Sequence, residues 1–104
     1  MAKIPDWYKS QRKRYPEVFE AYERLGKACR DSGPLAPKEA ALAKLAIAVG
    51  ARLEGAVHSH VRRAIEAGAS PDECRHVVLL ATTTLGFPAM MAALSWVEDV
   101  LSRK

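Results

Sequence analysis

Three side chains that could do acid–base or metal chemistry lie close together in the stretch L-E-G-A-V-H-S-H, at residues 53–60. They are Glu54, His58 and His60. A helix advances by about 100° per residue, so the two histidines would lie about 200° apart and point to opposite sides. We therefore expect no chelation of a metal ion by this pair, and the sequence predicts no metal site. Each histidine has to be considered separately.

His60 falls on the apolar side of the expected helix, with small neighbours such as Ala56. Two interpretations are open: a core histidine that bonds a backbone carbonyl or a partner subunit, or a general acid or base whose pKa is shifted by burial. The spacing alone favours the first. His58 instead lines up with Glu54 at i−4 and Arg62 at i+4, which is typical of an ion pair on the solvent side.

The two cysteines, Cys29 and Cys74, fit neither a C-x-x-C motif nor the spacing of zinc ligands. Cys74 would lie in the first turn of a helix, where the helix N-terminus can lower the pKa of a thiol, but no second cysteine is near to resolve an oxidised form. We expect a structural role for it. Two free thiols and the absence of an apolar signal segment predict a reducing, cytoplasmic location.

The composition indicates one all-α domain. The 104 residues are 49% hydrophobic but only 7% aromatic, so the core must consist mainly of aliphatic side chains, as in close-packed helices. The net charge of +4 comes entirely from residues 1–14, while residues 15–104 are neutral. We expect a basic N-terminal arm or helix over residues 1–15 that is solvated or packs at an interface, and contact of this arm with nucleic-acid phosphates is the less favoured alternative.

Hydrophobic periodicity and turn residues predict about five helices. They begin at Pro16, near Pro37, near Leu53, at Pro71 and near Pro88, and the third is expected to stop at Gly68. Ser70 and Glu73 form a capping box at the start of the fourth helix.

Residues 77–97 carry no charge and are long enough to cross a bilayer. Three threonines, Gly86 and Pro88 interrupt them, so two buried helices are predicted and not a membrane span. Helices that are apolar on every side need cover on every side, and one small subunit cannot provide it. We therefore expect an obligate homo-oligomer.

Three stretches carry a resemblance to a known family: L-A-P-K-E-A-A-L-A-K-L-A-I-A-V at 35–49, H-V-R-R-A-I-E-A-G-A-S-P-D-E at 60–73 and G-F-P-A-M-M-A-A-L at 86–94. From about residue 16 to 101 the chain resembles the carboxymuconolactone decarboxylase family, whose superfamily includes the alkylhydroperoxidase D-like proteins. The resemblance implies a single-domain helical bundle over residues 16–104, assembled into a homotrimer or homohexamer. It also implies a pocket near the family histidine, which falls on His60.

The peroxidase-like branch of this superfamily has a C-x-x-C pair seven and four positions before that histidine, where this chain has Leu53 and Ala56. Since neither position holds a thiol, no thiol could attack a peroxide from there. A glutamate frequent in the family is also absent, because its position is occupied by Ala41. Members similar to the decarboxylase itself also lack the cysteines and carry an Arg-x-Glu-like stretch, which Arg52 and Glu54 approximate.

The decarboxylase branch works without metal or organic cofactor on a small lactone that bears carboxylates. The resemblance thus implies His60 and Glu54 as catalytic residues, and Arg52, Arg63 and His58 as substrate-binding residues, for decarboxylation of a small organic acid or lactone. Two alternatives are an antioxidant, alkylhydroperoxidase-like activity of the peroxiredoxin type, which needs a reactive cysteine, and a non-enzymatic ligand-binding module.

Overall fold

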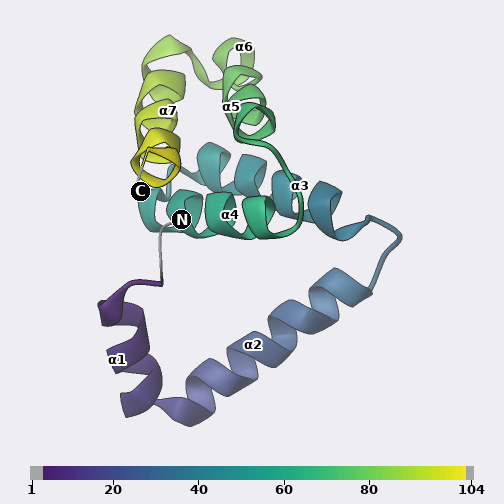
Figure 1. Ribbon diagram of the computed structural model, residues 1–104, viewed down its shortest axis with the longest axis vertical. Helices are drawn as coiled ribbons and strands as arrows, with labels where there is room; N and C mark the ends of the chain where they lie inside the picture. The colour runs from purple at the N-terminus through teal and green to yellow at the C-terminus, as the bar shows by residue number, and fades with distance from the viewer. Residues whose placement is uncertain (1–3, 103–104) are drawn as a thin grey trace. The chain divides into compact units, whose positions relative to one another are not determined.

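The computed structural model describes residues 4–102, and the regular structure in that range is entirely helical (Figure 1). The helices are α1 (Asp6–Arg14), α2 (Pro16–Asp31), α3 (Pro37–Ala51), α4 (Glu54–Glu66), α5 (Pro71–Leu79), α6 (Thr82–Leu85) and α7 (Phe87–Leu101). The prediction of an all-α fold is confirmed. The five expected helices correspond to α2, α3, α4, α5 and α7, while α1 occupies the basic arm and α6 is a single turn at the end of the expected fourth helix.

The chain divides into two compact units, residues 4–36 and residues 37–102. The first unit contains α1 and α2, so the expected boundary near residue 15 falls inside it. Tyr8 and Phe19 meet edge to face with 5.2 Å between ring centroids, and the Arg12 guanidinium donates two hydrogen bonds of 2.9 Å to the Glu23 carboxylate. No residue of either helix is buried. These contacts hold the two helices together without a core of their own.

The second unit has a continuous aliphatic core. Helix α3 packs against α4, α4 against α7, and α5 against both α3 and α7; α5 and α7 lie side by side and cross the α3–α4 pair (Figure 1). The buried residues are Leu45, Ala48, Val49, Val57, Val61, Ala64, Ala69, Cys74, Val78, Met90, Ala93, Val97 and Val100. On α4 they recur at i, i+4 and i+7, which is one face of a helix. This buried stripe fixes the rotation of α4 about its axis.

Helix α4 ends in a Schellman motif, as the glycine signal predicted. Gly68 has a φ of +103°, a conformation that glycine adopts without a Cβ penalty. Its N–H donates to the carbonyl of Ile65 at 3.1 Å, and the N–H of Ala69 donates to the carbonyl of Ala64 at 2.9 Å. Two carbonyls of the last turn of α4 are thereby paired.

Helix α5 begins directly afterwards with the predicted capping box, which is confirmed. The Glu73 N–H donates to Ser70 Oγ at 3.0 Å, and the Ser70 N–H donates to Glu73 Oε1 at 2.8 Å. Lys38, in the first turn of α3, reaches Glu73 Oε2 at 3.0 Å. The bond from the Ser70 N–H and the Lys38 ammonium both lower the pKa of the Glu73 carboxyl.

The charge-free stretch is divided at Gly86, as the sequence predicted, and also after Leu79, where the expected fourth helix was predicted to continue. Helix α5 ends at Leu79, α6 adds one turn, and Gly86 turns the chain into α7 with φ +100° and ψ 156°. This backbone region is nearly exclusive to glycine. None of the helices in residues 4–102 is long and apolar enough to cross a membrane.

Candidate functional site

Helix α4 carries four of the five residues that the sequence singled out for chemistry: Glu54, His58, His60 and Arg63. Because its buried stripe faces the core, the two histidines lie on opposite flanks of that stripe, each about one third of a turn or less from it. Neither histidine is fully buried. The structure thus separates them, as the spacing predicted.

His60 occupies a half-buried position with one unpaired nitrogen. Its Nδ1 is buried and has no hydrogen-bond partner. Burial, and then the positive charges of Lys44 and Arg63, lower the pKa of His60 to about 4. At neutral pH the imidazole is therefore uncharged. A buried unpaired lone pair is less unfavourable than a buried unpaired N–H, which favours the tautomer with its proton on Nε2.

The charges around His60 are suited to an anion. Lys44 on α3 and Arg63 on α4 are exposed, and the positive charge of each disfavours a proton on the imidazole. A carboxylate bound beside them would offset this positive field and raise the pKa of His60 towards its ordinary value. Anion binding and proton uptake would then be coupled. Sequence reasoning missed Lys44, because it lies on another helix and only the packing of α3 on α4 brings it into the field of His60.

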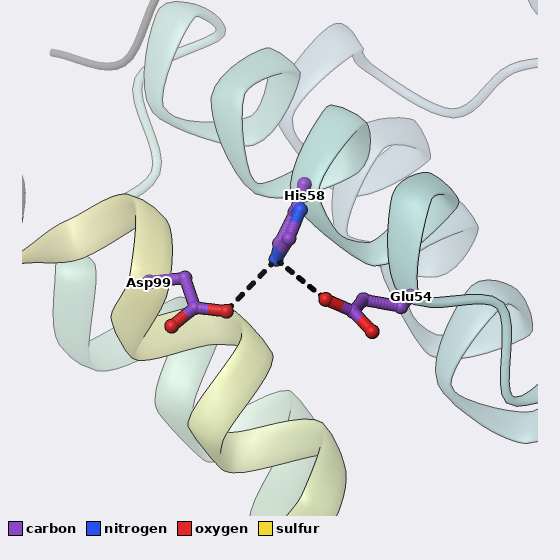
Figure 2. A group of neighbouring side chains, drawn as sticks. All are labelled: Glu54, His58 and Asp99. Atoms are coloured by element: carbon purple, nitrogen blue, oxygen red, sulfur yellow. Dashed lines mark hydrogen bonds and ion pairs between the residues drawn. The ribbon is translucent and has the colours of Figure 1, made fainter.

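His58 belongs to a second group on the other flank of α4. Its Nε2 lies 3.1 Å from Asp99 Oδ2 on α7 and 4.0 Å from Glu54 Oε2 (Figure 2). The predicted approach of Glu54 and His58 is confirmed, although 4.0 Å is longer than a hydrogen bond. Asp99 was missed because it lies 41 positions beyond His58. The Glu54 carboxylate, expected to act with His60, is thus placed beside His58.

Arg52 lies in the turn between α3 and α4. It is exposed and has a φ of +58°, which is uncommon for a residue with a side chain. Its N–H donates to the carbonyl of Val49 at 3.1 Å and so closes the end of α3. The five predicted residues therefore form two groups, His60 with Arg63 and His58 with Glu54, and Arg52 sits in the turn that leads into the helix.

The cysteines give no support to peroxide chemistry. Cys74 is completely buried, and burial raises the pKa of its thiol, opposite to the lowering that a helix N-terminus can produce. Cys29 is exposed on α2, in the other unit, and neither cysteine forms a disulfide. A structural role for Cys74 is consistent with these observations.

An apolar groove of about 420 Å³ lies between α3 and the segment formed by α5 and α6. Its lining consists of Leu42, Ala43, Ala46, Val49, Gly50, Val77, Leu80, Ala81, Thr84 and Leu85. His60 is not among these residues. The groove has no ionisable side chain, so it offers shape and hydrophobic contact but no acid–base chemistry.

Comparison with known protein families matches residues 16–99 to the carboxymuconolactone decarboxylase family. The match begins at the first residue of α2 and ends at Asp99, so it includes both groups of α4. The corresponding searches of curated proteins and of solved structures found no match. On the strength of a match that covers most of its length, the chain belongs to the carboxymuconolactone decarboxylase family.

Proposed function

We propose that this protein binds a small organic acid or lactone that carries a carboxylate beside His60, and that it acts as a cofactor-independent lyase of the decarboxylase type. The observation that carries the proposal is the half-buried imidazole of His60, which burial keeps uncharged together with the positive charges of Lys44 and Arg63. Membership of the family supports a reaction of this class.

The proposed reaction uses these three side chains for binding and for proton transfer. Lys44 and Arg63 hold a carboxylate of the ligand, and its negative charge raises the pKa of His60 so that the ring takes up a proton. The carbon–carbon bond to a carboxylate then breaks, CO₂ leaves, and the electron pair stays on the ligand carbon. Protonated His60 delivers a proton to that carbon, as a general acid.

Turnover is tested with carboxymuconolactone, by following the loss of its ultraviolet absorbance. We expect His60→Ala to reduce the rate by about 10²-fold or more, because general acid catalysis contributes that much. His76→Ala, which removes an exposed histidine of α5, is the matched control and should leave the rate unchanged. An equal rate in His60→Ala and the parent protein would contradict the role of His60.

Binding is tested separately, because a family member can keep the ligand site without catalysis. We expect Lys44→Met and Arg63→Met each to weaken binding of small dicarboxylates in calorimetry. Lys27→Met, which removes an exposed lysine of α2 paired with Asp31, should have no effect. Binding without turnover would identify a ligand-binding member of the family. Unchanged binding and unchanged turnover in both variants would exclude this site.

We also propose that the subunits form a homotrimer or homohexamer. Several large apolar side chains of the second unit are exposed, among them Ile47 on α3, Leu80 after α5 and Phe87 on α7, with 67%, 63% and 60% of their surface accessible. Where such side chains adjoin, they form the kind of apolar surface that marks a protein–protein interface. Partner subunits would cover α3, whose apolar residues surround the whole helix.

A further inference from the structure

The group formed by Glu54, His58 and Asp99 brings three possible metal-ligand atoms to one place. Glu54 and His58 are four residues apart on α4, and Asp99 lies in the last turn of α7. One nitrogen and two carboxylate oxygens all lie within 4.8 Å of one another. Figure 2 shows the edge of the His58 ring directed into the space between the two carboxylates.

The imidazole alone cannot satisfy both carboxylates. Nε2 can donate one hydrogen bond, and its distance of 3.1 Å assigns that bond to Asp99 Oδ2. Glu54 Oε2 remains at 4.0 Å. Two negative charges therefore converge on a single ring nitrogen, an arrangement in which a bound cation would be stabilised by all three groups.

The shortest of the three separations already fits a first-row divalent ion. Metal–nitrogen and metal–oxygen bonds of about 2.0–2.2 Å place neighbouring ligands about 3.0 Å apart in an octahedral site and about 3.4 Å apart in a tetrahedral one. The distance from His58 to Asp99 is already 3.1 Å. The Glu54 side chain is 58% exposed, so a small rotamer change can shorten its 4.0 Å separation.

The ligand types select the class of ion. Imidazole suits zinc, cobalt, nickel and copper, whereas magnesium and calcium prefer sites made of oxygen atoms alone. His58 is the more enclosed member, with 22% of its side chain exposed, and its place on α4 is fixed by the core. The carboxylates are more exposed, so water can complete the coordination sphere.

We propose that Glu54, His58 and Asp99 bind a divalent first-row transition-metal ion that joins the start of α4 to the last turn of α7. The site uses the flank of α4 opposite His60 and is independent of the proposed function. Bound ion would stabilise the folded state by mass action, because the three ligands come together only when α4 packs on α7. The sequence predicted no metal site because only the two histidines of one helix were compared. Asp99, the third ligand, comes from a different helix.

The test is calorimetry with ZnCl₂ on the full chain without an affinity tag, in a Cys29→Ser background so that the exposed thiol does not compete. We expect one Zn²⁺ per chain, a rise in Tm with Zn²⁺, and no comparable effect of Mg²⁺. Asp99→Asn and His58→Gln should each weaken Zn²⁺ binding at least tenfold. Neither variant should show the visible spectrum that Co²⁺ gives when it is bound to the parent site.

Two control variants separate this site from unspecific binding. His76→Gln removes an exposed histidine of α5, and Asp72→Asn removes an exposed carboxylate that pairs with Arg75; both should retain the affinity of the background protein. His60→Asn should also retain it, which distinguishes failure here from failure of the proposed function. Absence of saturable Zn²⁺ binding with a Kd of about 100 µM or tighter, or equal binding by His58→Gln, would overturn the proposal.

Discussion

Histidine changes its charge near neutral pH, and in this protein two histidines of one helix face opposite electrostatic surroundings. His60 lies in the positive field of Lys44 and Arg63, whereas His58 faces the carboxylates of Glu54 and Asp99. A spacing of two residues on a helix is sufficient to produce this separation. The same short segment can therefore serve an anion on one flank and a cation on the other.

The lowered pKa of His60 predicts a specific dependence of stability on pH. In the unfolded chain His60 has its ordinary pKa of 6.5, and in the folded chain its pKa is about 4. Between these values the unfolded state binds more protons, so the free energy of unfolding should fall as the pH is lowered from 6.5 to 4. Urea denaturation at a series of pH values measures this.

The variant His60→Gln should lose this part of the pH dependence, since glutamine does not titrate. His76→Gln changes an exposed histidine of α5 and should keep the parent protein's dependence of the free energy of unfolding on pH. A parent protein and His60→Gln with the same slope between pH 4 and 6.5 would show that the imidazole is not held uncharged in the folded state.

The two thiols should differ strongly in reactivity. Cys74 is completely buried and the pKa of its thiol is raised, whereas Cys29 is exposed. We expect one thiol per chain to react rapidly with Ellman's reagent in the folded protein, and two after denaturation. Cys29→Ser should remove the rapid reaction and Cys74→Ala should not. Rapid reaction of two thiols in the folded protein would contradict the burial of Cys74.

At the scale of elements, local signals were sufficient to predict the end of α4 and the start of α5. The capping box at Ser70 and Glu73 and the stop at Gly68 depend on neighbouring residues only, and the structure confirms them. Contacts between helices could not be predicted in this way. The approach of Lys44 to His60 and of Asp99 to His58 depends on how α3 and α7 pack on α4, which no spacing rule within one helix describes.

Loss of the capping box should have a measurable cost. Ser70→Ala removes the hydroxyl that accepts the Glu73 N–H, and we expect the free energy of unfolding to fall by about 1 kcal/mol. Ser95→Ala is the matched control, because the Ser95 hydroxyl of α7 only donates to the carbonyl of Ala92 within the helix. Its effect in the same denaturation experiment should be small. Equal stability of Ser70→Ala and the parent protein would show that the cap contributes nothing.

At the scale of the whole molecule, the single chain leaves many large apolar side chains exposed. The first unit has no buried residue in either helix, and the second exposes Ile47 and Leu80. The composition predicted the need for additional cover, since helices such as α3 are apolar all round. The sequence could not indicate which residues of a subunit stay exposed, because that depends on the packing of all helices together.

Size-exclusion chromatography with light scattering should therefore give a mass of three or six chains. We expect Ile47→Glu to reduce this mass with the helical circular dichroism retained, because Ile47 is exposed in the subunit and the charge would be unpaired at an interface. Ser95→Glu places the same charge at an exposed site on α7 and should leave the mass unchanged. A stable monomer of the parent protein at micromolar concentration would contradict the proposed oligomer.

The Schellman motif that ends α4 and the capping box that begins α5 follow each other directly, and this restricts where the chain can gain or lose residues. The N–H groups of all four residues from 67 to 70 donate hydrogen bonds, the first three within the end of α4 and that of Ser70 to Glu73 of α5, and Ala69 is buried. An inserted residue would break both motifs at once and shift the register of α5 relative to the core. Relatives that gain or lose residues should therefore do so elsewhere, for example at residues 32–36, where the chain is exposed and joins two units.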